Sequence, residues 1–286
     1  MNEFLSNLAE LSKPRICLMA LIMAMIGFLV ASPSSINFWE MVRMLVGTGL
    51  VGVSCGMLNQ YIERGVDAKM WRTMKRPLPS ERMEPRYALI AGLVTGILGE
   101  IVLLFLVNPV TAVLGAFTIF FYLGIYTPMK ATSPLSTIVG AIPGALPPLI
   151  GATAAAGHIE PMGFLLFSIL LLWQIPHFLA IGWLYREDYA RAGLPILTVV
   201  DPGGKFMAKQ SILYAAVLLP LVLVPVVWGV VGTYYLWGAF MIGLAFLLAS
   251  VLMARFRDVF WARFVFFLSL VYLPVIGILM VWDRTL

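Results

Sequence analysis

Nine apolar runs, each 17 to 26 residues long, restrict what this sequence of 286 residues can fold into. A helix needs about 20 mostly apolar residues to cross a bilayer, and only helices or closed barrels satisfy their backbone there. The runs are too long for barrel strands. We therefore predict an all-α membrane protein with nine transmembrane helices around a central cavity. The predicted spans are residues 16–32, 38–61, 87–107, 109–126, 135–156, 163–184, 206–231, 236–253 and 264–282.

The composition excludes a soluble protein. Charged residues make up 12% of the chain, whereas about 25% is usual in a soluble domain. The net charge of +5 lies beside apolar runs, so we expect a bilayer as the partner and no nucleic acid. Cys17 and Cys55 both lie within apolar runs, which predicts neither a disulfide nor a cysteine zinc site. We expect residues 1–286 to form one integral-membrane domain.

The basic residues predict an orientation, because short loops rich in Lys and Arg stay on the cytoplasmic side. With a cytoplasmic N-terminus, 17 of the 19 Lys and Arg residues fall inside, and only Arg43 and Arg284 fall outside. Nine spans then place the C-terminus outside. No organelle transit peptide precedes the first run, so we expect a bacterial inner membrane. The two longest loops, about 62–86 and 185–205, are cytoplasmic, and we expect the active site there.

The first of these loops follows three polar residues with a spacing of four. On a helix that continues the second span, Asn59, Glu63 and Asp67 lie along one face. Oxygen ligands at the membrane edge suit Mg²⁺, which proteins hold with one or two carboxylates, water and substrate phosphate. An amide inside the apolar run is costly without a partner, which favours a functional role for Asn59.

Three cations follow the carboxylates directly, namely Arg72, Lys75 and Arg76. The guanidinium fork matches the geometry of phosphate oxygens. Carboxylates for a metal beside cations for phosphate predict a diphosphate site. The alternative is a solvated loop that follows the charge rule for cytoplasmic segments, in which Glu63 and Asp67 only balance the charge.

The second loop and the sixth span supply further candidates. Asp188 and Tyr185 could present a metal or phosphate ligand that faces the first cluster, although a solvated turn explains this loop better when it is taken alone. Gln174 and His177 lie on neighbouring parts of one helix face beside Pro176, which loosens the helix. Polar groups at this depth are typical of a substrate path. The alternative for this pair is a hydrogen bond between helices.

The fifth span is rich in Pro and Gly, with the segment 140–148 carrying three prolines and two glycines. Small residues allow helices to approach closely, and prolines kink them. We therefore predict that this span lines the interior and does not face lipid.

These motifs together carry a resemblance that spans nearly the whole chain. They are Lys13 to Arg15, the block 59–79, and the segments 126–130, 144–148, 173–178 and 188–195. The chain resembles the protohaem IX farnesyltransferases, a branch of the UbiA superfamily of intramembrane prenyltransferases. The resemblance implies a nine-helix enzyme that transfers farnesyl from farnesyl diphosphate to a vinyl group of haem b. The product is haem o, the step before haem a for terminal oxidases.

The resemblance also implies the reaction and its partners. Diphosphate leaves the allylic carbon, a haem vinyl group attacks, and water adds to give a hydroxyethylfarnesyl group. Mg²⁺ is the implied cofactor, and haem b is a substrate. The downstream haem a synthase is the implied candidate protein partner.

The resemblance assigns roles to twelve residues. Catalysis and Mg²⁺ ligation correspond to Asn59, Glu63, Asp67 and Asp188. Diphosphate binding corresponds to Arg72, Arg76, Lys130 and Tyr126. The acceptor pocket for haem corresponds to His177, Gln174, Trp173 and Tyr185.

The chain departs from the family at three positions. Members often carry Asp where this chain has Gly65, and a basic residue and Asn where it has Ala131 and Ser136. With fewer acidic oxygens, we expect weak Mg²⁺ binding before diphosphate arrives, and we expect Gly65→Asp to strengthen it.

Two other functions stay open at this point. A related prenyltransferase could act on a quinone precursor, with residues 173–177 contacting a different acceptor. A transporter would also use broken helices and polar residues at the membrane midplane. It does not explain a carboxylate and arginine cluster confined to one face.

Overall fold

The chain folds almost entirely into helices. The computed structural model describes residues 2–32 and 36–285, is 80% helical and contains no strand within those two ranges. Two short segments interrupt the longer helices, a π-helical segment η1 (Phe121–Tyr126) and α6 (Thr127–Met129). The other helices are α1 (Asn2–Leu11), α2 (Pro14–Ala31), α3 (Phe38–Asp67), α4 (Pro85–Leu106), α5 (Pro109–Phe120), α7 (Ser136–Ala156), α8 (Pro161–Leu184), α9 (Arg186–Arg191), α10 (Leu197–Val200), α11 (Lys205–Leu221), α12 (Val224–Val227), α13 (Thr233–Phe256) and α14 (Val259–Trp282).

The predicted all-α fold with nine spans is confirmed. Within the described ranges, nine helical stretches are long and apolar enough to cross a membrane, and their bounds lie close to the predicted runs. The largest difference is at α3, which continues to Asp67, six residues beyond the predicted end. This extension carries Glu63 and Asp67 on the same helix as Asn59.

Helix α1 was not predicted from the sequence. It is amphipathic, and its last residue, Leu11, is fully buried against the bundle. Arg82, from the loop that follows α3, donates to Asn7 Oδ1 at 2.8 Å and pairs with Glu10 at 2.8 Å. Helix α1 therefore ties the N-terminus to the loop that carries the candidate site.

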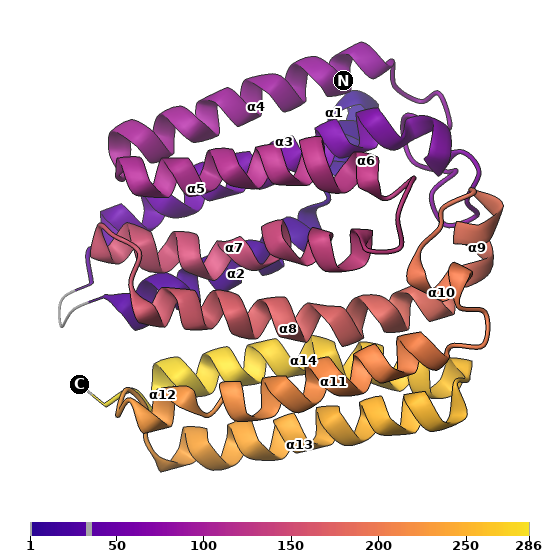
Figure 1. Cartoon of the computed structure of the whole chain (residues 1–286). Coiled ribbons are helices and arrows are strands. Elements are labelled where there is room, and N and C mark those ends of the chain that lie inside the picture. Colours follow the sequence, from indigo (N-terminus) through magenta and orange to yellow (C-terminus); the bar gives the residue numbers. More distant parts are fainter. Residues whose placement is uncertain (1, 33–35, 286) are drawn as a thin grey trace.

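The spanning helices form two groups that pack against each other. Helices α2, α3, α4, α5 and α7 pack together, and α8, α11, α13 and α14 form the second group. Contacts of α7 with α8 and of α2 with α14 join the groups. Figure 1 shows α9, α10 and the loop after α3 at one end of the bundle, with α12 at the other end.

Helix α7 lies in the interior, as its Pro and Gly content predicts. In its most apolar stretch of 18 residues, 67% of the stretch is buried inside the protein, the largest share among the candidate spans of the described chain. Gly151 of α7 sits against the backbone of Ala24, and Gly27 of α2 sits against the backbone of Pro148. A Cβ at either glycine would collide with main-chain atoms, so these residues set the close approach of α2 to α7.

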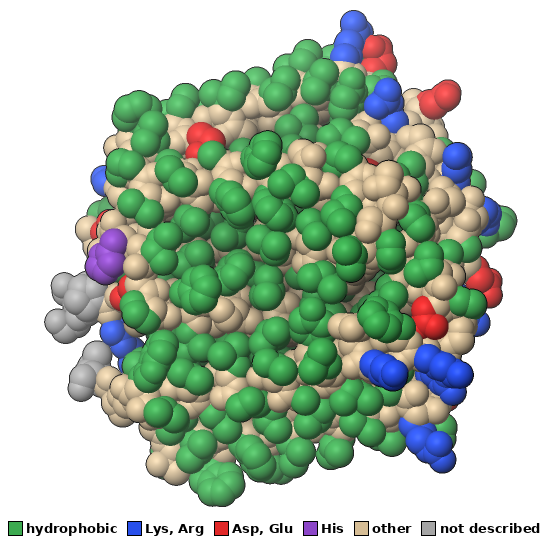
Figure 2. All heavy atoms as spheres, viewed as in Figure 1, with side chains coloured by type: hydrophobic (Ala, Val, Ile, Leu, Met, Phe, Trp, Pro, Cys, Tyr) green, Lys and Arg blue, Asp and Glu red, His purple; other side chains and the backbone are tan. Residues whose placement is uncertain are grey.

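The surface of the bundle separates apolar from charged side chains. Figure 2 shows a broad band of hydrophobic side chains between the two ends, with most Lys, Arg, Asp and Glu of this face gathered at the end of α9 and α10. Large apolar side chains of the spanning helices, such as Phe105, Phe120 and Phe267, are more than 60% exposed. A bilayer would cover such a band.

Candidate active site

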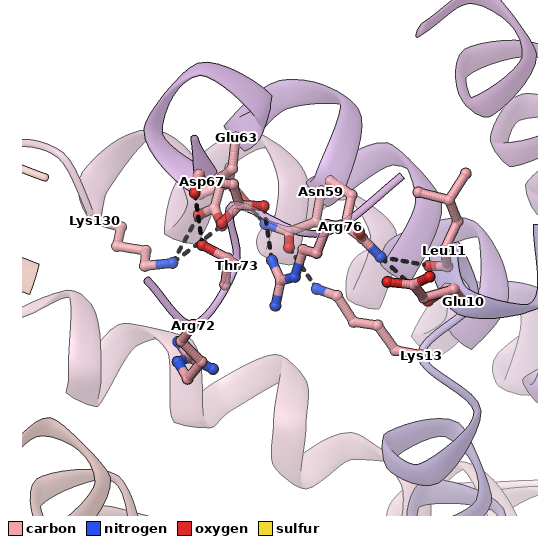
Figure 3. Close-up of polar contacts among 12 residues, drawn as sticks. Glu10, Leu11, Lys13, Asn59, Glu63, Asp67, Arg72, Thr73, Arg76 and Lys130 are labelled. Carbon is pink, nitrogen blue, oxygen red and sulfur yellow. Dashed lines mark hydrogen bonds and ion pairs between the residues drawn. The ribbon is translucent and has the colours of Figure 1, made fainter. Parts of the chain in front are cut away.

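The last three turns of α3 carry the core of the candidate site. Asn59, Glu63 and Asp67 are spaced by four residues, so they line one face, and they are only 2%, 7% and 1% exposed. Figure 3 shows them on the side of α3 that faces the interior of the bundle. The structure therefore brings together three of the four predicted metal ligands as one row.

Each of the three side chains pairs with a cation from another segment. Lys130 Nζ lies 3.1 and 3.0 Å from the two carboxylate oxygens of Glu63. Arg76 Nη1 donates to Asp67 Oδ2 at 2.7 Å, and Lys13 Nζ donates to Asn59 Oδ1 at 2.6 Å. These cations converge on a common space beside α3 (Figure 3). A polyanion in that space would meet hydrogen-bond donors from all three cations.

One carboxylate oxygen in this row has no partner. Asp67 Oδ1 is buried and forms no hydrogen bond, although burying an unpaired carboxylate oxygen is costly. The described residues contain no group of three or more His, Cys, Asp or Glu side chains that could enclose a metal. Two carboxylates and an amide fit Mg²⁺ only if substrate phosphate and water complete its shell, which is usual for this ion.

The π-helical segment η1 explains how Lys130 reaches Glu63. Pro128 has no backbone N–H to continue the α-helical pattern, and the Thr127 hydroxyl donates to the Tyr122 carbonyl five residues earlier at 2.8 Å. Asn59 Nδ2 donates in turn to Thr127 Oγ1 at 3.2 Å. Single π turns inside helices are frequent at functional sites. The predicted residue Tyr126 lies on this segment, one turn before Lys130.

The turn after α3 returns Arg76 to the carboxylate row. The Thr73 hydroxyl donates to the Asp67 carbonyl at 2.8 Å, and the Arg76 N–H donates to the Thr73 carbonyl at 3.0 Å. Arg72 takes another direction, and its guanidinium carbon lies 5.2 Å from the Tyr185 ring centre and 5.8 Å from that of Tyr189. The structure therefore places the two predicted diphosphate arginines on different sides of the turn.

Asp188 joins the two predicted loops. Its Oδ1 accepts the backbone N–H of Trp71 at 3.0 Å and Arg191 Nη2 at 2.6 Å, and its Oδ2 accepts the backbone N–H of Arg72 at 3.1 Å. Asp188 is 7% exposed, so these bonds lie in a largely dry environment. This carboxylate holds the 71–72 turn in place, a role that the sequence did not indicate.

The predicted acceptor residues fall into two places. Trp173 and His177 pack together and both reach Ser269 of α14, with His177 Nδ1 at 2.6 Å from the hydroxyl and Trp173 Nε1 at 3.1 Å from the carbonyl. Gln174 donates to the Ala141 carbonyl of α7 at 3.3 Å. These are the hydrogen bonds between helices that the alternative interpretation expected. Tyr185 lies apart from them, 42% exposed and beside Arg72.

Two charged residues near or within the membrane were not assigned roles from the sequence. Lys13 contacts Asn59. The pKa of its ammonium is lowered to about 8, mainly because the group is buried and secondly because the positive charge of Arg76 is close. Glu100 lies in α4 and lines an apolar cavity of about 360 Å³ between α3, α4 and α5. A carboxylate within an apolar run is itself a signal of function that could have identified Glu100.

Gly65 faces away from the carboxylate row. Two residues along a helix correspond to about 200° of rotation, so Gly65 lies nearly opposite Glu63, and a Cβ there would meet nothing within 4 Å. An aspartate at this position would extend into open space. The expectation that Gly65→Asp strengthens Mg²⁺ binding therefore needs correction.

We predict that Gly65→Asp leaves the Mg²⁺ affinity of the substrate-free protein within about twofold, because a solvated carboxylate on the far face is screened. Calorimetric titration of the purified protein with Mg²⁺ measures this. A rise of tenfold or more in affinity would show that the new carboxylate reaches the metal. Gly65→Ala is the matched control for the backbone effect of removing glycine.

Comparison with known proteins decides the family. The model of the UbiA prenyltransferase family matches residues 20–271. The chain belongs to the UbiA prenyltransferase family. This membership, together with the nine apolar helices found in the described part of the chain, makes it a multi-pass membrane protein.

Sequence relatives cover nearly its whole length. The chain is 45% identical over 284 residues to a protein from Solibacter usitatus named protoheme IX farnesyltransferase, covering 96% of this chain and 97% of that one. It is 38% identical to a protein of the same name from Opitutus terrae, covering 99% and 96% of the two chains.

Solved structures support the fold. A digeranylgeranylglyceryl phosphate synthase superposes with a TM-score of 0.83 at 19% identity, over 99% of each chain. A UbiA homolog from Archaeoglobus fulgidus, solved bound to GPP and Mg²⁺, superposes with a TM-score of 0.71 at 15% identity over 96% of this chain and 99% of that chain.

Proposed function

We propose that this prenyltransferase transfers the farnesyl group of farnesyl diphosphate to a vinyl group of haem b and so forms haem o. The donor chemistry is supported by one observation above all, the unpartnered Asp67 Oδ1 in a row of oxygen ligands that pairs with three cations, Lys13, Arg76 and Lys130. The acceptor follows from the relatives, which carry the name protoheme IX farnesyltransferase over nearly the full length of the chain. A quinone precursor as acceptor lacks this support.

We assign Mg²⁺ ligation to Asp67 first, with Glu63 and Asn59 on the same face and Asp188 from the second loop. Asp67 Oδ1 is free, and Asp188 Oδ2 accepts a single hydrogen bond, so both oxygens have lone pairs available. Mg²⁺, when bound, neutralises the charge that develops on the leaving diphosphate. The UbiA homolog bound to GPP and Mg²⁺ shares this fold.

The cations of the chain hold the diphosphate in our proposal. Arg76 pairs with Asp67 and Lys130 with Glu63, and the remaining N–H groups of both cations would donate to phosphate oxygens beside the carboxylates that would hold the metal. Arg72 binds from the other side of the turn, and Tyr126 lies one turn before Lys130 in the sequence. The loss of diphosphate from the allylic carbon then occurs against fixed positive charge, which favours ionisation.

The acceptor residues position haem b and keep water out. A vinyl carbon attacks the farnesyl carbon that diphosphate has left, and water adds afterwards to the adjacent carbon. The walls formed by Trp173, His177 and Phe266 are aromatic and largely buried, which delays that water until the carbon–carbon bond exists. Gln174 fixes the distance between α7 and α8 at this level.

We place the protein in a bacterial inner membrane with its N-terminus in the cytoplasm and its C-terminus outside. The concentration of Lys and Arg at the end of the bundle that carries α9 supports this orientation. Haem o is an intermediate for haem a, so the haem a synthase downstream is the candidate partner that receives it. Crosslinking in membranes that contain both proteins tests this partnership.

The deciding experiment incubates membranes containing the chain with farnesyl diphosphate, haem b and Mg²⁺, and identifies the extracted haems by mass spectrometry. We expect haem o, together with one diphosphate released for each haem consumed. Prenylation of a quinone precursor and not of haem b would show the related activity. Release of no diphosphate would favour a transporter.

We predict that His177→Ala impairs the use of haem b more than that of farnesyl diphosphate. His177 stacks on Trp173 and Phe266 and bonds Ser269, so its loss opens the wall between α8 and α14. We expect KM for haem b to rise by about tenfold, with KM for farnesyl diphosphate unchanged. The exposed His158 provides the control variant His158→Ala. Equal losses for both substrates would favour a purely structural role.

A further inference from the structure

A groove at the end of the bundle that carries α9 adjoins the candidate site, and Arg72, Tyr185 and Asp188 are among its lining residues. Its volume is about 700 Å³, within the range of pockets that hold organic molecules. Three segments far apart in the sequence form it: the turn at Trp71 and Arg72, the end of α8 with the start of α9, and the turn between α13 and α14. Figure 1 shows these segments at the same end of the bundle.

Aromatic side chains line one part of the groove. Trp71 is 72% exposed and Tyr185 is 42% exposed. Trp183 forms the floor, with the guanidinium carbon of Arg186 4.5 Å from its ring centre. Arg191 lies over one face of the Trp71 ring at 4.2 Å and Arg72 over one face of the Tyr185 ring at 5.2 Å. The exposed remainder of these two rings can accept a planar ring system by stacking.

The arginines of the groove have no carboxylate partners. Among the described residues, no Asp or Glu oxygen lies within 4.0 Å of the guanidinium of Arg72, Arg186 or Arg257. Arg257 instead donates to the Gly203 carbonyl at 2.8 Å, which holds its side chain in a fixed position. Arg186 only stacks on Trp183. Their positive charge is therefore available to an anionic ligand.

Three acidic residues also line the groove, and two of them are engaged. Asp188 accepts three hydrogen bonds, one of them from Arg191. Asp258 Oδ1 accepts the Trp261 N–H at 2.8 Å and caps α14. Glu187 is exposed to solvent, where its charge is screened. The available hydrogen-bond donors of the groove are thus the arginine forks.

We propose that this groove binds the edge of the porphyrin acceptor that carries its two carboxylates, with Arg186 and Arg257 as their anchors. The proposal rests on the proposed function, because haem b is the acceptor there, a planar macrocycle with two propionate side chains. A guanidinium binds a carboxylate through two parallel hydrogen bonds, whereas the aromatic surfaces of Trp71 and Tyr185 take the ring.

The position of the groove suits the reaction. Arg72 lines it, and its backbone is held by Asp188, which also faces the turn leading to Asp67 and Arg76. An acceptor anchored here by its carboxylates lies next to the diphosphate site. Its anionic edge stays at the charged end of the protein, and the opposite edge, which carries vinyl groups, points toward the apolar bundle.

The test compares two porphyrins on the purified full-length protein. Zinc protoporphyrin IX and its dimethyl ester share the ring and the vinyl groups, and only the first has free carboxylates. Fluorescence titration without farnesyl diphosphate measures the binding of each to wild type, Arg186→Gln, Arg257→Gln and the control Arg255→Gln. Arg255 is exposed on the last turn of α13 and does not line the groove.

We expect wild type to bind the diacid at least about tenfold more tightly than the ester, since loss of one charge-assisted hydrogen bond weakens binding by about tenfold or more. Arg186→Gln and Arg257→Gln should each lose about tenfold for the diacid and nothing for the ester. Arg186→Lys and Arg257→Lys should recover part of that loss. The control should match wild type.

Two results would overturn the proposal. The first is diacid binding that neither glutamine variant weakens, and the second is a loss that is equal for diacid and ester and that lysine does not recover. Haem o formation by the same wild-type preparation tests the transferase separately. If haem o is absent while the diacid preference persists, the proposed function fails and the groove still binds porphyrin carboxylates.

Discussion

Asp67→Asn should lower haem o formation by about 10³-fold or more while the protein stays folded and inserted. Asp67 is 1% exposed, one of its oxygens is free, and the other balances Arg76 at 2.7 Å. The amide has nearly the same shape but carries no charge, so it binds Mg²⁺ poorly and leaves the cation of Arg76 unbalanced. Loss of a metal ligand removes several kcal/mol of transition-state stabilisation, which corresponds to this factor.

The measurement is haem o per unit of membrane protein, by mass spectrometry, over a series of Mg²⁺ concentrations. Glu84→Gln is the matched control, because Glu84 is an exposed carboxylate in the same loop, paired at the surface with Arg86. It should leave activity unchanged, as exposed ion pairs contribute little. Near-normal product from Asp67→Asn at low Mg²⁺ would contradict its role as a ligand.

The spanning helices could be predicted from the sequence because the bilayer imposes one simple requirement, about 20 apolar residues in a row. The helix ends were less predictable. Helix α3 continues past the apolar run to Asp67 because the polar side chains of its last turns have partners inside the bundle, a tertiary effect. Helix α1 could not be predicted because it is amphipathic and short. Its role can be recognised only when its contact with the loop that carries Arg82 is known.

The carboxylate row could also be predicted, since a spacing of four on one helix fixes which residues share a face. The partners of that row could not. Lys13, Lys130 and Arg76 come from three different segments, and their convergence depends on the π-helical segment and on the turn at Thr73. Periodicity contains no information about such long-range contacts.

The acceptor side shows the same limit. The sequence marks His177 as a polar residue at depth, but its bond to Ser269 comes from a helix that begins more than 80 residues later. Arg257 counted only toward the orientation of the chain, and its place beside Arg186 in one groove depends on how α13 and α14 turn at the end of the bundle. Such residues are found only when the packing of the helices is known.

Asp188→Asn should lower haem o formation by about 10²-fold, and the pattern of its effects separates two roles. The carboxylate accepts the N–H groups of Trp71 and Arg72 and the fork of Arg191. An amide has one accepting oxygen, so its NH₂ group must face a donor, and at least one bond to a charged acceptor is lost. Each such bond contributes about 1.5–3 kcal/mol, which gives the expected factor.

If Asp188 is a metal ligand, the variant Asp188→Asn needs a higher Mg²⁺ concentration to reach half of its maximal activity. If Asp188 positions the 71–72 turn, the same variant has a higher KM for farnesyl diphosphate because Arg72 is displaced. The double variant Asp188→Asn with Arg72→Gln distinguishes the second role, because effects that pass through one contact are not additive. We expect the double variant to be no worse than about twofold below the poorer single variant. Full additivity would contradict the positioning role, and an unchanged Mg²⁺ requirement in Asp188→Asn would contradict ligation.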